Sequence, residues 1–219
     1  MTSGHRQLLT LSVDSVVLEG VLALPPAPRG MVLFAHGSGS SRLSPRNNAV
    51  AAHLREAGMG TLLMDLLGEH EQPDTAARFN IALLARRLGV AADWLADHSA
   101  THHLPLGLFG ASTGAAAALS LAAERAALVR AVVSRGGRPE LADGAVLPAV
   151  RAPTLLIVGA LDAEVAALNR RALALLQCEK RLDIVPAATH LFEEAGALQT
   201  VAQLAAGWFS QHLAGDVPA

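Results

Sequence analysis

The sequence predicts an α/β protein in which helices cover both faces of a mostly parallel central sheet. Hydrophobic residues make up 52% of the 219 residues and charged residues only 16%, so most elements should be buried on at least one face. In addition, short apolar runs alternate with segments of helical spacing, which is the pattern of parallel strands joined by crossover helices. The length fits one domain over residues 1–219.

The chain opens with an expected antiparallel hairpin. Its two apolar runs are "QLLTLSV" and "SVVLEGVLAL", which meet at "DS", and the turn-forming residues "PPAPRG" close the second run. A hairpin at this position is expected to form an edge of the sheet.

Six further apolar runs have the length of strands and mostly do not alternate with polar residues, so burial on both faces is expected. They are "MVLFAH" (31–36), "TLLMDL" (61–66), "LGLFGA" (106–111), "RAVVSR" (130–135), "TLLIVG" (154–159) and "RLDIVP" (181–186). Helical spacing is found at 47–58, roughly 77–97, 113–127, 163–177 and 193–213. Only residues 136–153 separate the fourth run from the fifth, which is too few for a large lid.

A serine stands at the end of the third of these runs. Ser112 lies between Gly110 and Gly114, where the strand should turn sharply into a helix. The turn brings backbone close to the positions two residues either side of the serine, so glycine is favoured there, as in the G-x-S-x-G nucleophile elbow. The alanines at 115–118 would let the helix pack closely on the sheet. The alternative is a Gly-Ser turn that only reverses the chain.

A nucleophilic serine needs a base, and the base needs an acid to orient it. Asp162 follows "TLLIVG" and His190 follows "RLDIVP", so each lies past the end of a later strand. The carboxyl ends of parallel strands gather at one edge, which would bring both side chains to Ser112. Alternatively, Asp162 caps the helix after it and His190 is a solvated loop residue.

Acyl transfer also needs N–H donors for the oxyanion. One donor is expected from Thr113, which follows the nucleophile, and the other from Ser38 in "HGSGSS", which follows an early strand. A dinucleotide-binding loop is the competing interpretation of this glycine-rich stretch. However, Arg42 occupies the third glycine position of G-x-G-x-x-G.

With "HGSGSS", "GASTG", "GALD" and "ATHLFEE", the chain resembles the α/β-hydrolases of the dienelactone-hydrolase-like group. It particularly resembles the small hydrolase domain that some bacterial proteins fuse to a phosphoribosyltransferase domain, and the likeness extends from about residue 8 to 213. The resemblance implies an α/β-hydrolase fold without a large lid and a Ser112, Asp162, His190 triad. Authentic dienelactone hydrolases carry cysteine at the elbow, so dienelactone is not the expected substrate. No role coupled to the phosphoribosyltransferase domain is carried over.

Four further residues are candidates for binding substrate: His36, Arg46, Glu69 and Arg135. Either arginine could hold a substrate carboxylate. The structural alternative is that they bind carbonyl oxygens, Asp65 or Glu69. The stretch 68–74 should lie on the rim of the site, with a solvated acidic loop as its alternative. No metal or cofactor is expected, because His102 and His103 precede a strand and so lie at the opposite edge.

The expected function is that of a serine carboxylesterase acting on short acyl esters of roughly two to six carbons, because no lid would cover a longer chain. A thioesterase, an amidase, an acyltransferase and a non-catalytic scaffold remain alternatives. A net charge of −2 without a basic cluster argues against nucleic acid as a partner. We expect no membrane segment and a cytoplasmic location, since a signal peptide is not evident and Cys178 stands alone. The oligomeric state, including a homodimer, stays open.

Overall fold

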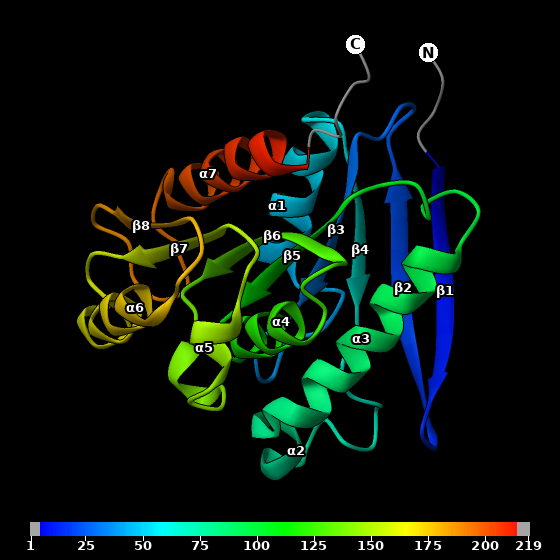
Figure 1. Ribbon diagram of the computed structural model, residues 1–219, viewed down its shortest axis with the longest axis horizontal. Helices are drawn as coiled ribbons and strands as arrows, with labels where there is room; N and C mark the ends of the chain where they lie inside the picture. The colour runs from blue at the N-terminus through cyan, green and yellow to red at the C-terminus, as the bar shows by residue number, and fades with distance from the viewer. Residues whose placement is uncertain (1–4, 214–219) are drawn as a thin grey trace.

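The computed structural model describes residues 5–213 and contains an eight-stranded sheet in the order β1-β2-β4-β3-β5-β6-β7-β8 (Figure 1). The strands are β1 (His5–Val13), β2 (Val16–Leu24), β3 (Gly30–Ala35), β4 (Met59–Met64), β5 (Leu106–Ala111), β6 (Val129–Arg135), β7 (Thr154–Gly159) and β8 (Lys180–Val185). All pairs from β4 to β8 are parallel, whereas β1 pairs with β2 and β2 with β4 in antiparallel register. The predicted mostly parallel sheet is confirmed.

The N-terminal hairpin is also confirmed, and it forms one edge of the sheet (Figure 1). Its turn places Asp14 at φ 55°, in the left-handed region that tight hairpin turns need. The second half of β1 alternates, with Leu9, Leu11 and Val13 buried and the residues between them exposed. A strand that faces solvent on one side produces this alternation, and the central strands β3, β4, β5 and β7 are buried throughout.

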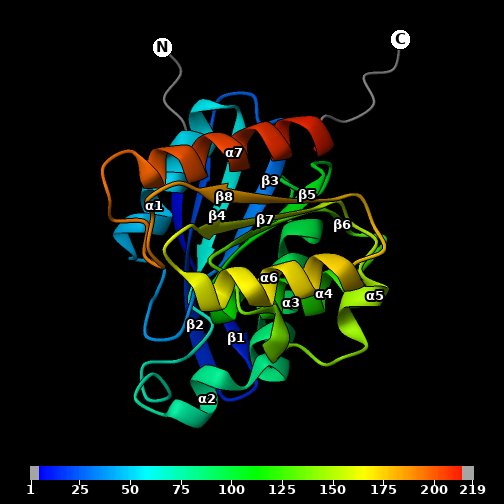
Figure 2. The same ribbon diagram turned by 90° about the vertical axis from the view of Figure 1, so that its left-hand side faces the viewer.

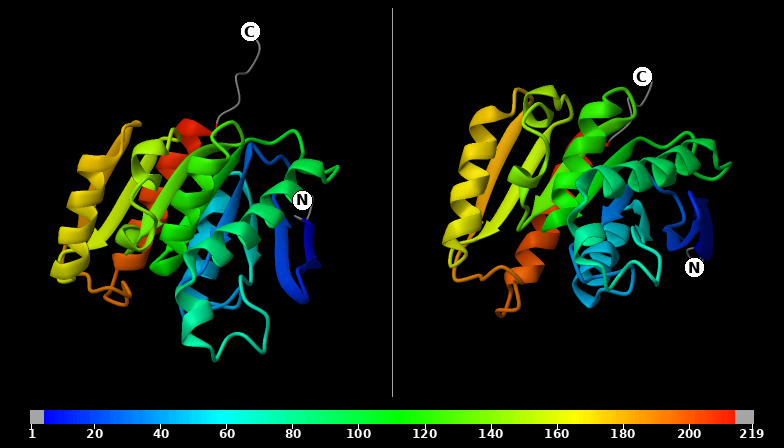
Figure 3. Two further views of the ribbon diagram at one scale, coloured as in Figure 1. Left: turned by 60° about the horizontal axis from the view of Figure 1, so that its bottom comes forward. Right: turned by 90° about the horizontal axis from the view of Figure 1, so that it is seen from below.

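Helices cover both faces of the sheet, as Figures 2 and 3 show. Helices α1 (Pro45–Glu56) and α7 (Ala197–His212) pack on one face, and α3 (Ile81–Asp97), α4 (Thr113–Glu124), α5 (Val146–Ala149) and α6 (Ala163–Leu175) lie on the other. The alanines at 115–118 in α4 are completely buried, which allows the close packing that the sequence predicts. Apolar side chains fill both layers between helices and sheet.

Several helix boundaries differ from the sequence-based expectation, and three of the differences have a local cause. The helix expected over 77–97 is divided into α2 (Thr75–Phe79) and α3, because Asn80 leaves the helical region (ψ 85°) and its side chain caps α3 by accepting the N–H of Leu83 at 3.0 Å. The last helix begins at Ala197 rather than 193, since Gly196 has a φ of 81°. The first helix begins at Pro45, after the cap of Ser44.

The carboxyl ends of β3, β5, β6, β7 and β8 lie along one edge of the sheet, and the loops that follow them form the candidate site. Between β6 and β7 the chain forms only a short 3-10 turn (Pro139–Leu141) and α5. The described part of the chain therefore has no large lid in this connection, as the sequence predicts. No helix among residues 5–213 is long and apolar enough to cross a membrane.

Candidate active site

Ser112 occupies a strained turn between β5 and α4. Its φ of 52° and ψ of −121° lie in a region that residues with a side chain rarely adopt. A Cβ at Gly110 would lie 2.4 Å from the Cα of Ala115, and one at Gly114 would lie 2.2 Å from the carbonyl oxygen of Ala35. Both flanking positions therefore require glycine, and the serine side chain is held at the top of the strand.

Asp162 and His190 form the acid–base pair of the site. The Nδ1 atom of His190 lies 2.6 Å from Oδ2 of Asp162, although 28 residues separate the two in sequence. Asp162 stands at the N-cap position of α6, but its side chain makes no capping hydrogen bond. The carboxylate is therefore committed to the imidazole, which would carry its proton on Nδ1 and leave Nε2 to act as a base.

The loop after β6 connects Ser112 with the histidine. The N–H of Ser112 donates to the carbonyl oxygen of Arg135 at 3.1 Å. The next residue, Gly136, has a φ of 51°, and a Cβ there would lie 3.4 Å from the His190 ring. Ser112 and His190 thus contact two consecutive residues of this loop, Arg135 and Gly136. Within residues 5–213 the Ser112 hydroxyl itself makes no hydrogen bond, so its contact with His190 stays a prediction.

The loop after β3 lies directly against the elbow. A Cβ at Gly37 would lie 3.0 Å from the Cβ of Ser112. The N–H of Ser38, one of the two expected oxyanion donors, donates to Oγ1 of Thr113 at 2.8 Å. In this state it is therefore already bonded to the Thr113 side chain. Thr113 begins α4, where an N–H has no partner within the helix. The two residues expected to form the oxyanion hole are therefore in contact.

His36 is bonded to the backbone through both ring nitrogens, and its contact with substrate stays a prediction. The residue is 7% exposed, Nδ1 lies 2.9 Å from the Gly37 carbonyl oxygen, and Nε2 accepts the N–H of Leu66 at 3.0 Å. Both ring nitrogens are thus bound to backbone. Burial lowers the pKa of His36, in keeping with a neutral ring that accepts at Nε2. The side chain connects the loop after β3 to the loop after β4.

The other three candidate substrate-binding residues differ from one another in their surroundings. Arg46 donates from Nη1 to Oε1 of Glu193 at 2.7 Å. Arg135 is 8% exposed, and its side chain forms no hydrogen bond with another described residue. Glu69 is exposed. Neither arginine binds Asp65, because that carboxylate accepts the backbone N–H of Arg42 at 2.6 Å and a second bond from its guanidinium.

An ion pair that was not predicted from the sequence holds the rim of the site, residues 68–74. Arg87 in α3, whose side chain is 2% exposed, donates to both carboxylate oxygens of Glu71 at 2.6 and 2.8 Å and to the Leu66 carbonyl oxygen at 3.0 Å. The hydrogen bond from Arg87 lowers the pKa of Glu71. Glu71 also accepts the N–H of Gly68 at 2.8 Å. The signal for this anchor was an arginine on the apolar face of a helix.

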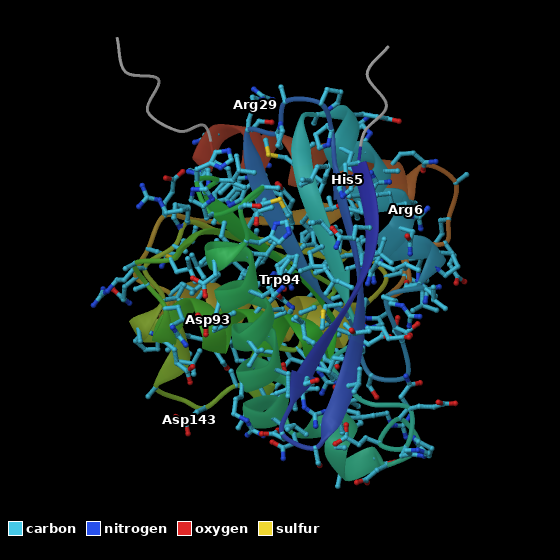
Figure 4. All side chains as sticks on the ribbon, turned by 90° about the vertical axis from the view of Figure 1, so that its right-hand side faces the viewer. His5, Arg6, Arg29, Asp93, Trp94 and Asp143 are labelled. Carbon is cyan, nitrogen blue, oxygen red and sulfur yellow. The ribbon has the colours of Figure 1, made fainter. Side chains whose placement is uncertain are left out.

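The hollow nearest the elbow is small. It measures about 40 Å³ and is lined by the loop 36–40 together with Leu67, Gln72, Arg78 and Leu84. Larger hollows of about 440 and 1030 Å³ lie elsewhere, and no triad residue lines them. His5 and Arg6 line the first of these, and Asp93 and Asp143 line the second; all four residues are labelled in Figure 4. Among the described residues, no three His, Cys, Asp or Glu side chains are grouped as metal ligands would be.

The chain is similar over nearly its whole length to a solved structure described as dienelactone hydrolase from Anabaena variabilis. The two are 55% identical, the match covers 96% of this chain and 99% of the other, and the TM-score is 0.92. The chain belongs to the dienelactone hydrolase family. It is an α/β-hydrolase, as its motifs indicate, and a serine stands at its elbow.

Other relatives of this dienelactone hydrolase family member define how far the likeness extends. A putative phosphoribosyl transferase from Mycobacterium tuberculosis is 55% identical over 203 residues, which are 93% of this chain and 46% of the relative. The chain thus spans about half the length of that curated relative. Est1E from Butyrivibrio proteoclasticus, at 16% identity and a TM-score of 0.81, shows the same fold over 97% of the chain. No protein-family model matches the chain.

Proposed function

We propose that the chain is a serine carboxylesterase that hydrolyses short-chain acyl esters through an acyl-enzyme at Ser112. The observation that carries this proposal is the 2.6 Å contact between Asp162 and His190, at the same sheet edge as the strained elbow. An acid–imidazole pair beside a partly exposed nucleophilic serine is the arrangement that acyl transfer needs. The hydrolases among its structural neighbours agree with this chemistry.

In the proposed reaction, His190 Nε2 takes the proton of the Ser112 hydroxyl as its oxygen attacks the ester carbonyl. The tetrahedral intermediate collapses, the alcohol leaves with the proton from His190, and the acyl group stays on the serine. Water then attacks the acyl-enzyme, gives its proton to His190 and releases the carboxylic acid. Throughout, Asp162 keeps the ring in one tautomer and stabilises its positive charge.

The amides of Ser38 and Thr113 are the proposed donors to the oxyanion. Because the Thr113 hydroxyl accepts the Ser38 N–H at 2.8 Å in the free protein, the threonine side chain must rotate or share this donor when the oxyanion forms. Short acyl groups are proposed because the connection between β6 and β7 forms no large lid and the hollow beside the loop 36–40 measures only about 40 Å³.

A serine-directed fluorophosphonate tests the nucleophile. We expect the intact mass to increase by one adduct, mapped to Ser112, and the label to be lost in Ser112→Ala but kept in the matched Ser210→Ala variant of α7. A 4-nitrophenyl ester series should show its maximum between acetate and hexanoate. An acetyl thioester and an acetanilide in the same assay test the related acyl-transfer reactions. An unlabelled Ser112 in folded protein would mean a non-catalytic scaffold.

A further inference from the structure

A hollow of about 440 Å³ lies on the face of the sheet that carries α1, away from the proposed active site. Its volume is within the range of small-molecule sites in proteins. Arg6 and Arg55 line it, together with His5 and with apolar side chains of β2 and β4. His5 and Arg6 begin β1 and are labelled in Figure 4. No residue of the proposed triad lines this hollow, so the esterase reaction does not account for it.

The pairing of the strands explains why both arginines face this hollow. Arg6 in β1 stands opposite Ala23 in β2, and Ala23 stands opposite Thr61 in β4, so the three side chains project from the same face of the sheet. The Arg55 guanidinium extends from α1 and donates from Nη1 to Oγ1 of Thr61 at 3.1 Å. Among residues 5–213, the apolar layer beneath α1 and α7 includes no residue of β1 or β2, so this part of the face lies open beside α1.

The two guanidinium groups of the hollow have no carboxylate partner in the described part of the chain, where no ion pair includes Arg6 or Arg55. Burial lowers the pKa of Arg55, the positive charge of Arg6 lowers it further, and Glu56 acts in the opposite direction. Glu56 lies at the rim, where its side chain is 78% exposed and Oε2 is 3.7 Å from Nδ1 of His53. The hollow thus brings together two like charges whose repulsion a bound anion would remove.

We infer that this hollow binds a phosphomonoester of a small organic molecule, with the phosphate group between Arg6 and Arg55. A phosphomonoester carries close to two negative charges at neutral pH, which match two guanidinium groups, and its oxygens fit their N–H donors. Val21, Pro25 and Leu63 offer apolar contacts to the organic part of the ligand. The inference goes beyond the proposed esterase function and does not depend on it, because the hollow and the triad share no residue.

Titration calorimetry with phenyl phosphate tests the site. In wild-type protein we expect phenyl phosphate to bind at least about 10-fold more tightly than benzoate, which has one negative charge, and than inorganic phosphate, which lacks the ring. Arg6→Gln should weaken binding about 10- to 100-fold, the range of a charge-assisted hydrogen bond, and Arg55→Lys should keep part of the binding that Arg55→Gln loses. Glu56→Gln should strengthen binding, since it removes the negative charge at the rim. Arg170→Gln, at an exposed position of α6 outside the hollow, should leave binding unchanged.

Arg6 is exposed, so Arg6→Gln tests the inference even if a substitution of the partly buried Arg55 prevents folding. As a second measurement, phenyl phosphate should raise the thermal midpoint of wild-type protein more than that of Arg6→Gln. The inference is overturned if phenyl phosphate binds no more tightly than benzoate, or if its affinity is unchanged in Arg6→Gln.

Ser112→Ala separates this hollow from the proposed active site, because the variant should bind phenyl phosphate as tightly as wild type does. A loss of binding in folded Ser112→Ala protein would mean that the ligand lies at the triad, which would also overturn the inference. If instead no ester is cleaved and Ser112 is unlabelled by a fluorophosphonate, the esterase proposal fails, and the phenyl phosphate titrations still decide on the phosphomonoester site.

Discussion

Replacing Asp162 by asparagine tests how much the carboxylate contributes to the proposed reaction. The change keeps the size of the side chain and removes its charge. In wild-type protein Oδ2 lies 2.6 Å from Nδ1 of His190, and the side chains of Asp162 and His190 are 15% and 37% exposed. The imidazole becomes positive when it takes the serine proton, so the attraction to the carboxylate is gained in the transition state and raises the rate.

The size of the effect follows from this geometry. The charge centres of the two groups lie about 4 Å apart, and at an effective dielectric constant of about 20 their attraction is about 4 kcal/mol. Solvent reaches the exposed part of His190, and screening reduces the attraction to about 2–3 kcal/mol, or a factor of about 30 to 150 in rate. The amide of asparagine can also donate to Nδ1 and hold the wrong tautomer. We therefore expect kcat/KM to fall by about 10²- to 10⁴-fold.

The assay is the hydrolysis of 4-nitrophenyl acetate, followed together with the rate of fluorophosphonate labelling at Ser112. Both rates should fall in Asp162→Asn. The matched control is Asp183→Asn on β8, where the carboxylate pairs with Arg181 and lies outside the candidate site. If folded Asp162→Asn protein kept its activity within about threefold of wild type, the pair would not serve as base and orienting acid.

Three further predictions concern the scaffold of the site. Gly114→Ala would place a Cβ 2.2 Å from a backbone oxygen, so calorimetry should show a thermal midpoint about 5–10 °C below that of wild type. In the control Gly207→Ala the new Cβ meets no atom within 4 Å, so the thermal midpoint should be unchanged or higher. Burial lowers the pKa of His36 below its usual 6.5, so the unfolded chain takes up the proton first as the pH falls. The contribution of the neutral ring to stability is therefore full above pH 6.5 and decreases below it. Urea unfolding should show that His36→Gln loses less stability in acid than wild-type protein does. The guanidinium bonded to Glu71 lowers the pKa of that carboxyl below 4.5, so the ion pair stabilises the fold above pH 4.5 and this stabilisation is lost as the pH falls through the lowered value. Glu71→Gln should therefore be less stable than wild type at pH 7. A difference in unfolding free energy between the two proteins that stayed unchanged at about pH 3 would contradict this.

The succession of strands and helices along the chain and the elbow could be predicted from the sequence because both leave strong local patterns. Buried parallel strands are continuous apolar runs, and the close backbone contacts around Ser112 admit only glycine at positions 110 and 114. The pairing of Asp162 with His190 was also open to prediction, since residues after parallel strands gather at one edge. These features depend on the parallel direction of the strands, which the alternation of strands and helices along the chain specifies.

What the sequence could not specify depends on individual side-chain contacts. The two backbone hydrogen bonds of the His36 ring could not be predicted, because no local pattern distinguishes a histidine bonded to the backbone from one that contacts only substrate. The bond between the Ser38 N–H and the Thr113 hydroxyl joins residues that are 75 positions apart. The break of the helix at Asn80 depends on a capping hydrogen bond that competes with helical spacing.

The attachment of the rim has a consequence for changing what this hydrolase accepts. The segment 68–80 carries no member of the proposed triad, and Glu71 ties it to the body of the protein through Arg87, with His36 holding the loop just before it. The other positions of this segment can therefore be exchanged or lengthened to admit bulkier substrates, provided that the contacts of Glu71 and His36 are retained. Selectivity could then be redesigned independently of the chemical machinery beneath it.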